Sequence, residues 1–158
     1  MSPDVYSFRG SLNLSDSTRL FEFAVDTELC AVVRMLIDAG IDLNIRRNGG
    51  DTSLICAARL GRESIVKILV DAGADLNAGN GDGNTALISG SRYGRDAIIQ
   101  ILVDAGADLN VKAVDGRTAL ICAARHGNEI TVQILVDAGA DLNAKCNDGN
   151  TALIWAAS

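Results

Sequence analysis

The sequence predicts an all-α solenoid in which a helix-turn-helix unit repeats every 33 residues and each copy stacks on its neighbours. The first observation is repetition: the segment LVDAGADLN occurs three times without change, starting at Leu69, Leu102 and Leu135, and a variant, LIDAGIDLN, starts at Leu36. The second observation is composition. Hydrophobic residues make up 48% of the 158-residue chain and aromatic residues only 4%, which suits thin, alanine-rich helices packed closely together.

The repeating unit is clearest around Thr118, which precedes the apolar run ALICAAR. The threonine hydroxyl predicts an N-cap for a helix over 119–126, which ends at Gly127. A second helix is predicted over 129–138, and its apolar residues from Ile130 onward give a broad face expected to pack on both neighbouring repeats. Neither helix is long enough to be stable alone, so stacking must supply the stability. The capping threonine recurs at the same repeat position as Thr52, Thr85, Thr118 and Thr151.

The repeats divide the chain into an N-terminal tail over 1–13 and a repeat domain over 14–158. Within the domain we expect an N-terminal cap repeat at 14–46, internal repeats at 47–79, 80–112 and 113–145, and a partial repeat at 146–158. In the cap repeat, Leu20, Phe21 and Ala24 are expected to point inward. The partial repeat stops after an apolar first helix, so we expect either a chain that continues in a longer array or an end that pairs with another molecule.

The repeat at 80–112 differs from its neighbours inside the first helix, where Ser89-Gly90-Ser91 replaces Cys-Ala-Ala. Glycine inside a helix costs roughly 1 kcal/mol relative to alanine. We expect sequence drift that weakens this repeat. The alternative is that Gly90 permits a close contact.

Composition argues against several classes of protein. The net charge of -6 opposes general binding to nucleic acid or to anionic membranes, and no apolar run reaches the length of a membrane-spanning helix. The first residues lack the apolar core of a signal peptide, so we expect a soluble cytoplasmic protein. Cys56 and Cys122 lie two repeats apart, roughly 20 Å at the usual spacing of packed helices, so they cannot form a disulfide. The four cysteines have no zinc-site spacing and are expected to be small apolar residues in a reducing compartment.

No motif in the sequence points to catalysis. His126 is the only histidine and has no paired nucleophile, and no hydrolase, zinc-protease or dinucleotide-binding pattern is present. The glycine-rich stretch at 79–83 is not followed by the lysine of a phosphate-binding loop. Asp75 opens a stretch like a calcium loop, but Ala86 stands where that loop needs a carboxylate. We therefore expect no catalytic, cofactor-binding or metal-binding residues.

The pattern DGxTALIxAAxxG, followed by VxxLVDAGADLNA, resembles the ankyrin repeat family, and the resemblance covers nearly the whole chain from about residue 14. The family's usual TPLH motif is altered. Its proline is replaced at Ser53, Ala86, Ala119 and Ala152, and its histidine at Ile55, Ile88, Ile121 and Ile154. The missing histidine removes a hydrogen bond with which members of the family often tie their loops together.

The resemblance implies a protein-binding surface made of the loop tips and the concave face of the first helices. Position by position, the implied loop residues are Asp51, Asp82, Asn84, Asp115 and Arg117. The implied residues at the ends of the first helices are Arg59, Leu60, Arg92, Tyr93, Arg125 and His126.

Arginine recurs along that surface at the repeat period, as Arg59, Arg92 and Arg125, and Arg62 and Arg95 extend the basic strip. The strip predicts a partner protein or peptide that is acidic. Alternatively, repeat duplication copies any surface charge, and the arginines then need no ligand. A separate acidic ladder closes the second helices, at Asp38, Asp71, Asp104 and Asp137.

The sequence therefore favours a non-enzymatic protein–protein interaction module. One alternative is a structural scaffold that self-associates through the apolar residues near Leu153, Ile154 and Trp155. A second is the ankyrin part of a larger effector or enzyme.

Overall fold

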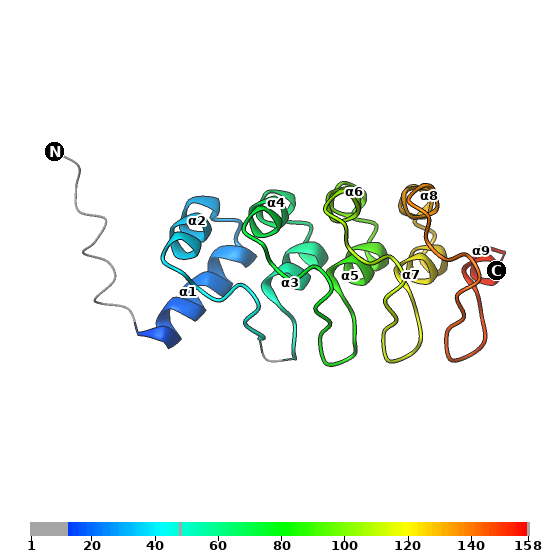
Figure 1. The fold of residues 1–158 in the computed structure, drawn as a ribbon, viewed down its shortest axis with the longest axis horizontal. Coiled ribbons are helices and arrows are strands. Elements are labelled where there is room, and N and C mark those ends of the chain that lie inside the picture. The colour runs from blue at the N-terminus through cyan, green and yellow to red at the C-terminus, as the bar shows by residue number, and fades with distance from the viewer. Residues whose placement is uncertain (1–12, 48, 158) are drawn as a thin grey trace.

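The computed structural model describes residues 13–47 and 49–157 (Figure 1). The expected tail lies outside the described residues except for Asn13. The described part of the chain is helical and contains α1 (Leu14–Asp26), α2 (Cys30–Asp38), α3 (Ser53–Leu60), α4 (Glu63–Asp71), α5 (Ala86–Arg92), α6 (Asp96–Asp104), α7 (Ala119–Arg125), α8 (Glu129–Asp137) and α9 (Ala152–Ala156).

The helices form two parallel rows (Figure 1). Helices α1, α3, α5, α7 and α9 pack one on the next in the first row, and α2, α4, α6 and α8 do so in the second. Long loops extend from the first row, on the side away from the second row (Figure 1). The prediction of an all-α solenoid is therefore confirmed, with consecutive helices of each repeat lying in different rows.

Threonine starts each internal first-row helix, as predicted. Its hydroxyl oxygen accepts a hydrogen bond from the backbone N–H three residues later, at 3.3 Å in Thr52–Ile55, 3.3 Å in Thr85–Ile88 and 3.4 Å in Thr118–Ile121. Thr151 has the same extended backbone, but its side chain makes no capping hydrogen bond. Gly61 and Gly127 follow the ends of α3 and α7 with φ of 78° and 70°, a left-handed conformation that glycine adopts without strain. Each helix of the second row ends on aspartate, so the acidic ladder is also confirmed.

Helix α1 is longer than the other first-row helices. The position equivalent to Ser53, one 33-residue repeat earlier, is Leu20, so α1 begins six residues sooner. Asn13 caps it, because its Oδ1 accepts the backbone N–H of Asp16 at 2.8 Å. Phe21 is buried, as predicted for this end of the core.

Aliphatic side chains from both rows form one continuous core between them. Leu54, Leu87 and Leu120 hold equivalent positions in the first row and are each 1% exposed. Leu153 occupies the same position in α9 and is 68% exposed. Each buried leucine lies between two repeats, so stacking supplies the burial that no single repeat provides.

Gly90 permits a close contact with Ile99, the alternative that the sequence left open. A Cβ atom at position 90 would lie 3.0 Å from Ile99 Cδ1, an atom that valine lacks. The equivalent pairs in the other repeats are Ala24 with Val33, Ala57 with Val66, and Ala123 with Val132. Compared with the other repeats, the repeat at 80–112 therefore lacks one methyl group at Gly90 and has one more at Ile99, so the packed volume stays constant.

The prediction that Ile130 packs in the core is wrong, because the side chain is 64% exposed. The next residue, Thr131, takes the buried position that Ile65 and Ile98 hold in the preceding repeats. The Thr131 hydroxyl donates a hydrogen bond to Asp96 Oδ1 on α6, which satisfies the buried hydroxyl. Helix α8 therefore buries less apolar surface than its sequence suggests and leaves an isoleucine on the outside.

A ladder of asparagine side chains ties successive loops together in place of the missing histidines. The Oδ1 atom of one repeat accepts the backbone N–H of an aspartate in the next, at 3.1 Å for Asn44–Asp75, 2.9 Å for Asn77–Asp108 and 2.8 Å for Asn110–Asp141. The long loops also meet directly, since Val114 N–H donates to the Asp82 carbonyl at 2.8 Å. The loop surface is therefore held in a defined shape relative to the helices.

Candidate functional site: the inner surface

The inner surface consists of the C-terminal ends of α3, α5 and α7 and the long loop that precedes each of these helices. Arg59, Arg92 and Arg125 lie in the last turns of the helices. A cation at this position is favourable to the partial negative charge of the helix end, by about 0.3–1 kcal/mol when exposed. The arginines therefore support the helices whether or not a ligand binds.

Arg59 already has an acidic neighbour within the chain. Its Nη2 lies 3.5 Å from Asp51 Oδ2 and 3.9 Å from Cys56 Sγ. The arginine side chain is 42% exposed and the aspartate 21%, so water screens the pair and its contribution to stability is small. The Asp51 charge nevertheless reduces the positive potential at this end of the strip.

Arg117 and Asp115 form a second internal pair, within the loop before α7. Arg117 Nη1 lies 2.9 Å from Asp115 Oδ2, and the Arg117 backbone N–H donates to Asp115 Oδ1 at 3.0 Å. The Arg117 side chain is only 19% exposed. These two predicted binding residues therefore shape the tip of their own loop.

Arg92 and Arg125 have no ion-pair partner among the described residues. Arg92 Nη2 donates to Asn84 Oδ1 at 3.5 Å. Asn84 is only 8% exposed, so this predicted site residue is buried and orients the Arg92 side chain. The Arg125 guanidinium lies over the Trp155 ring, 5.1 Å from the centroid. A cation–π contact of this kind orders the guanidinium without neutralising it.

Tyr93 and His126 lie directly beside these two arginines in sequence. Tyr93 is 50% exposed. His126 Nδ1 lies 2.8 Å from the Cys122 carbonyl oxygen, so Nδ1 carries a proton and donates it there. In the neutral ring this leaves Nε2 as a hydrogen-bond acceptor. Leu60, at the same position in α3, is 37% exposed and adds apolar surface.

The loops add negative charge to the inner surface. Asp82 is exposed, and its carboxylate has no ion-pair partner among the described residues. The predicted site residues thus fall into groups. Arg59 with Asp51 and Arg117 with Asp115 are paired internally, whereas Arg92, Arg125 and Asp82 retain charges that a partner can meet.

Arg62 connects its own repeat to the preceding one. Its Nε donates to the Asp26 carbonyl at 3.0 Å, and its Nη1 lies 3.6 Å from Glu28 Oε2. Asn128 holds the equivalent position two repeats on, and its Nδ2 donates to the Ser91 carbonyl at 2.7 Å. The structure thus gives this position a role in closing the end of the preceding first-row helix.

Trp155, on α9, lies outside the inner surface as defined but contacts it, and the sequence did not predict this role. The sequence groups it with the apolar residues Leu153 and Ile154, whereas in the structure its ring contacts the Arg125 guanidinium of the neighbouring repeat. Its position is held by Cys56 and Cys122 elsewhere, and no motif marks such a contact.

The cysteines are free thiols. Burial raises the pKa of the Cys56 and Cys122 thiols, and nearby arginines, Arg47 for Cys56 and Arg92 for Cys122, act against that rise. Among the described residues, no group of three or more His, Cys, Asp and Glu side chains could hold a metal ion. Nor does any helix in the described ranges have the length and apolarity needed to cross a membrane.

Comparison with known families accounts for the repeated unit. A family model described as Ankyrin repeats (3 copies) matches residues 20–113 and 110–158. A search of the curated proteins found no match. The matched ranges span most of the chain and contain every helix from α2 onward. The chain therefore belongs to the ankyrin repeat family.

Proposed function

We propose that this chain binds an acidic segment of a partner protein on its inner surface, through Arg92, Tyr93, Arg125 and His126. Ankyrin repeats generally act as protein–protein interaction modules. One observation carries the proposal of an acidic partner. Arg92 contacts Asn84 and Arg125 contacts Trp155, so both side chains are ordered, yet neither pairs with a carboxylate among the residues that the structure describes. A binding surface whose side chains are already ordered loses little conformational entropy when a partner docks.

The neighbouring side chains suit the same kind of partner. Tyr93 offers a large, half-exposed ring with few rotatable bonds, and tyrosine and arginine are common anchors of protein interfaces. His126 follows Arg125 in the chain and is exposed, so it adds a polar side chain to this end of the surface. Asp82 lies in the loop that precedes Arg92 and disfavours a partner with negative charge at that point, so the carboxylates of the partner should face the ends of α5 and α7.

The test compares two double variants with equal change in net charge. A partner is first identified by affinity capture from the native source, and its affinity is then measured with purified components by titration calorimetry. Arg92→Glu with Arg125→Glu should weaken binding at least a hundredfold, because two attractive contacts become repulsive. Arg34→Glu with Lys145→Glu, at exposed positions on α2 and in the last loop, should leave the affinity unchanged. Equal affinities of the two double variants would refute the proposal.

Self-association is a second candidate, favoured by one observation. Leu153 is 68% exposed in α9, although its equivalents in α3, α5 and α7 are buried. Light scattering decides between the two functions. A mass above that of one chain that Leu153→Glu reduces to a single chain would favour self-association, and a single chain throughout would exclude it.

A further inference from the structure

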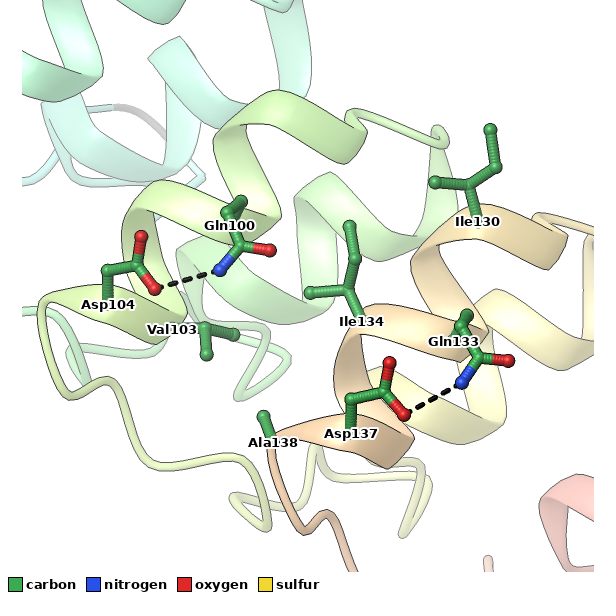
Figure 2. A pocket seen from close by; sticks show the side chains of 8 residues that line it. All are labelled: Gln100, Val103, Asp104, Ile130, Gln133, Ile134, Asp137 and Ala138. Atoms are coloured by element: carbon green, nitrogen blue, oxygen red, sulfur yellow. Dashed lines mark hydrogen bonds between the residues drawn. The ribbon is translucent and has the colours of Figure 1, made fainter.

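An open groove lies between α6 and α8, in the row of helices remote from the long loops (Figures 1 and 2). Its volume is about 370 Å³. The residues that line it are Gln100, Val103, Asp104, Ile130, Gln133, Ile134, Asp137 and Ala138.

One end of the groove is apolar. Ile130 is 64% exposed and projects from the start of α8, and Ile134 follows one turn later (Figure 2). Val103 also lines the groove and lies on α6 immediately before Asp104 (Figure 2). The positions equivalent to Ile130 are Ser64 on α4 and Ala97 on α6. A large exposed apolar side chain at this position therefore occurs on α8 but not on α4 or α6.

The other end of the groove is acidic. Asp104 and Asp137 close α6 and α8 and lie at the same end of the groove (Figure 2). Each accepts a hydrogen bond at 2.8 Å from the glutamine one turn earlier, Gln100 or Gln133, and neither has an ion-pair partner among the described residues. The C-terminal ends of two helices add partial negative charge to that of the two carboxylates.

The equivalent position between α4 and α6 differs in two ways that matter for a ligand. Lys67 stands where Gln100 does, and Ala97 stands where Ile130 does. Lys67 is a cation that pairs with Glu63 at 2.7 Å. Compared with the position between α4 and α6, the groove between α6 and α8 therefore has one positive charge fewer and one more exposed apolar side chain. Both differences favour a ligand that is cationic and apolar.

We propose that this groove binds a cationic amphipathic helix of a partner protein. The apolar residues of that helix would pack on Ile130, Ile134 and Val103, and a lysine or arginine would meet Asp104 and Asp137. Ile130 and Asp137 are seven residues apart on α8, about 10 Å along its axis. A partner helix that lies along the groove matches this distance with an apolar residue and a basic residue two turns apart. The site is distinct from the inner surface, so the two can be occupied together.

The experiment uses a synthetic, fluorescently labelled amphipathic peptide with a leucine stripe flanked by lysines, and a matched peptide in which glutamate replaces each lysine. Anisotropy measures affinity, and backbone amide shifts map the bound surface. The lysine peptide should bind and shift amides of α6 and α8, added salt should weaken it, and the glutamate peptide should not bind.

Variants of the chain then test each half of the groove. Ile130→Ala should lower the affinity about tenfold, because an apolar contact is lost, and the fold should tolerate the change since Ala97 holds the same position in α6. Asp104→Asn with Asp137→Asn should lower the affinity further and flatten its salt dependence. Asp71→Asn, the equivalent change on α4, should have no effect. The double variant Arg92→Glu with Arg125→Glu should also leave the affinity for the lysine peptide unchanged. This result would separate the groove from the inner surface.

Several results would overturn the proposal. These are equal binding of the two peptides, unchanged affinity in Ile130→Ala, and shifts confined to the inner surface. Self-association of the native chain that Ile130→Ala abolishes would also overturn it, because a second copy would then be the occupant of the groove.

Discussion

Replacing Gly90 by alanine in α5 tests whether the extra methyl group of Ile99 accounts for the glycine. The added Cβ would lie 3.0 Å from Ile99 Cδ1, and Ile99 is 0% exposed, so its side chain has little room to move. Two effects then oppose each other. Alanine gains about 1 kcal/mol over glycine inside a helix, whereas overpacking a close-packed core typically costs about 1–3 kcal/mol.

We expect Gly90→Ala alone to lower the free energy of unfolding by about 1 kcal/mol, since the overpacking term is the larger. In the Ile99→Val background the colliding atom is absent. The same change should then raise the free energy of unfolding by about 1–2 kcal/mol, from helix propensity and one buried methyl group. The coupling between the two sites is therefore about 2–3 kcal/mol.

The measurement is urea unfolding of the native chain, both single variants and the double variant, followed by far-ultraviolet circular dichroism. Because repeat arrays can unfold in stages, hydrogen exchange of amides in α5 and α6 should be measured on the same four proteins. Ala123→Gly is the matched control, because Val132 holds the position equivalent to Ile99, and it should cost about 1–2 kcal/mol. If Gly90→Ala stabilises the native chain as much as it stabilises Ile99→Val, the two sites are independent and the packing argument fails.

Two further predictions concern the loops and the thiols. Asn110→Ala removes the hydrogen bond at 2.8 Å to the Asp141 backbone N–H, so the free energy of unfolding should fall by about 1 kcal/mol. Hydrogen exchange should show the Asp141 amide exchanging faster. Asn143→Ala, at an exposed position, is the control and should leave the exchange of that amide unchanged. Burial raises the pKa of the Cys56 and Cys122 thiols, so the folded chain keeps them protonated where the unfolded chain loses the proton. The urea midpoint should therefore fall as the pH rises above about 8.5, and Cys56→Ala with Cys122→Ala should show a smaller fall. An equal pH dependence in that variant would contradict the assignment.

The candidate site was predictable in its positions and not in its pairing. The period alone places Arg59, Arg92 and Arg125 at equivalent ends of successive helices. It does not show that Arg59 faces Asp51 or that Arg125 stacks on Trp155. These partners differ from repeat to repeat, because the residue that an arginine meets depends on substitutions in its own loop and in the next repeat.

The sequence by itself determined the properties that depend on neighbours along the chain. The capping of α3, α5 and α7 by threonine, the left-handed glycines after α3 and α7, and the aspartate at the end of each second-row helix all follow from hydrogen bonds and dipoles within a few residues. The constant spacing of these signals then gives the stacked architecture, since equal units repeat equal contacts.

Only the tertiary structure decided how side chains meet between helices. The contact of Gly90 with Ile99, the exchange of roles between Ile130 and Thr131, and the groove between α6 and α8 all join side chains from different helices or repeats. The repeat period sets which positions are equivalent, but close packing between separate helices decides which side chains meet and which stay exposed.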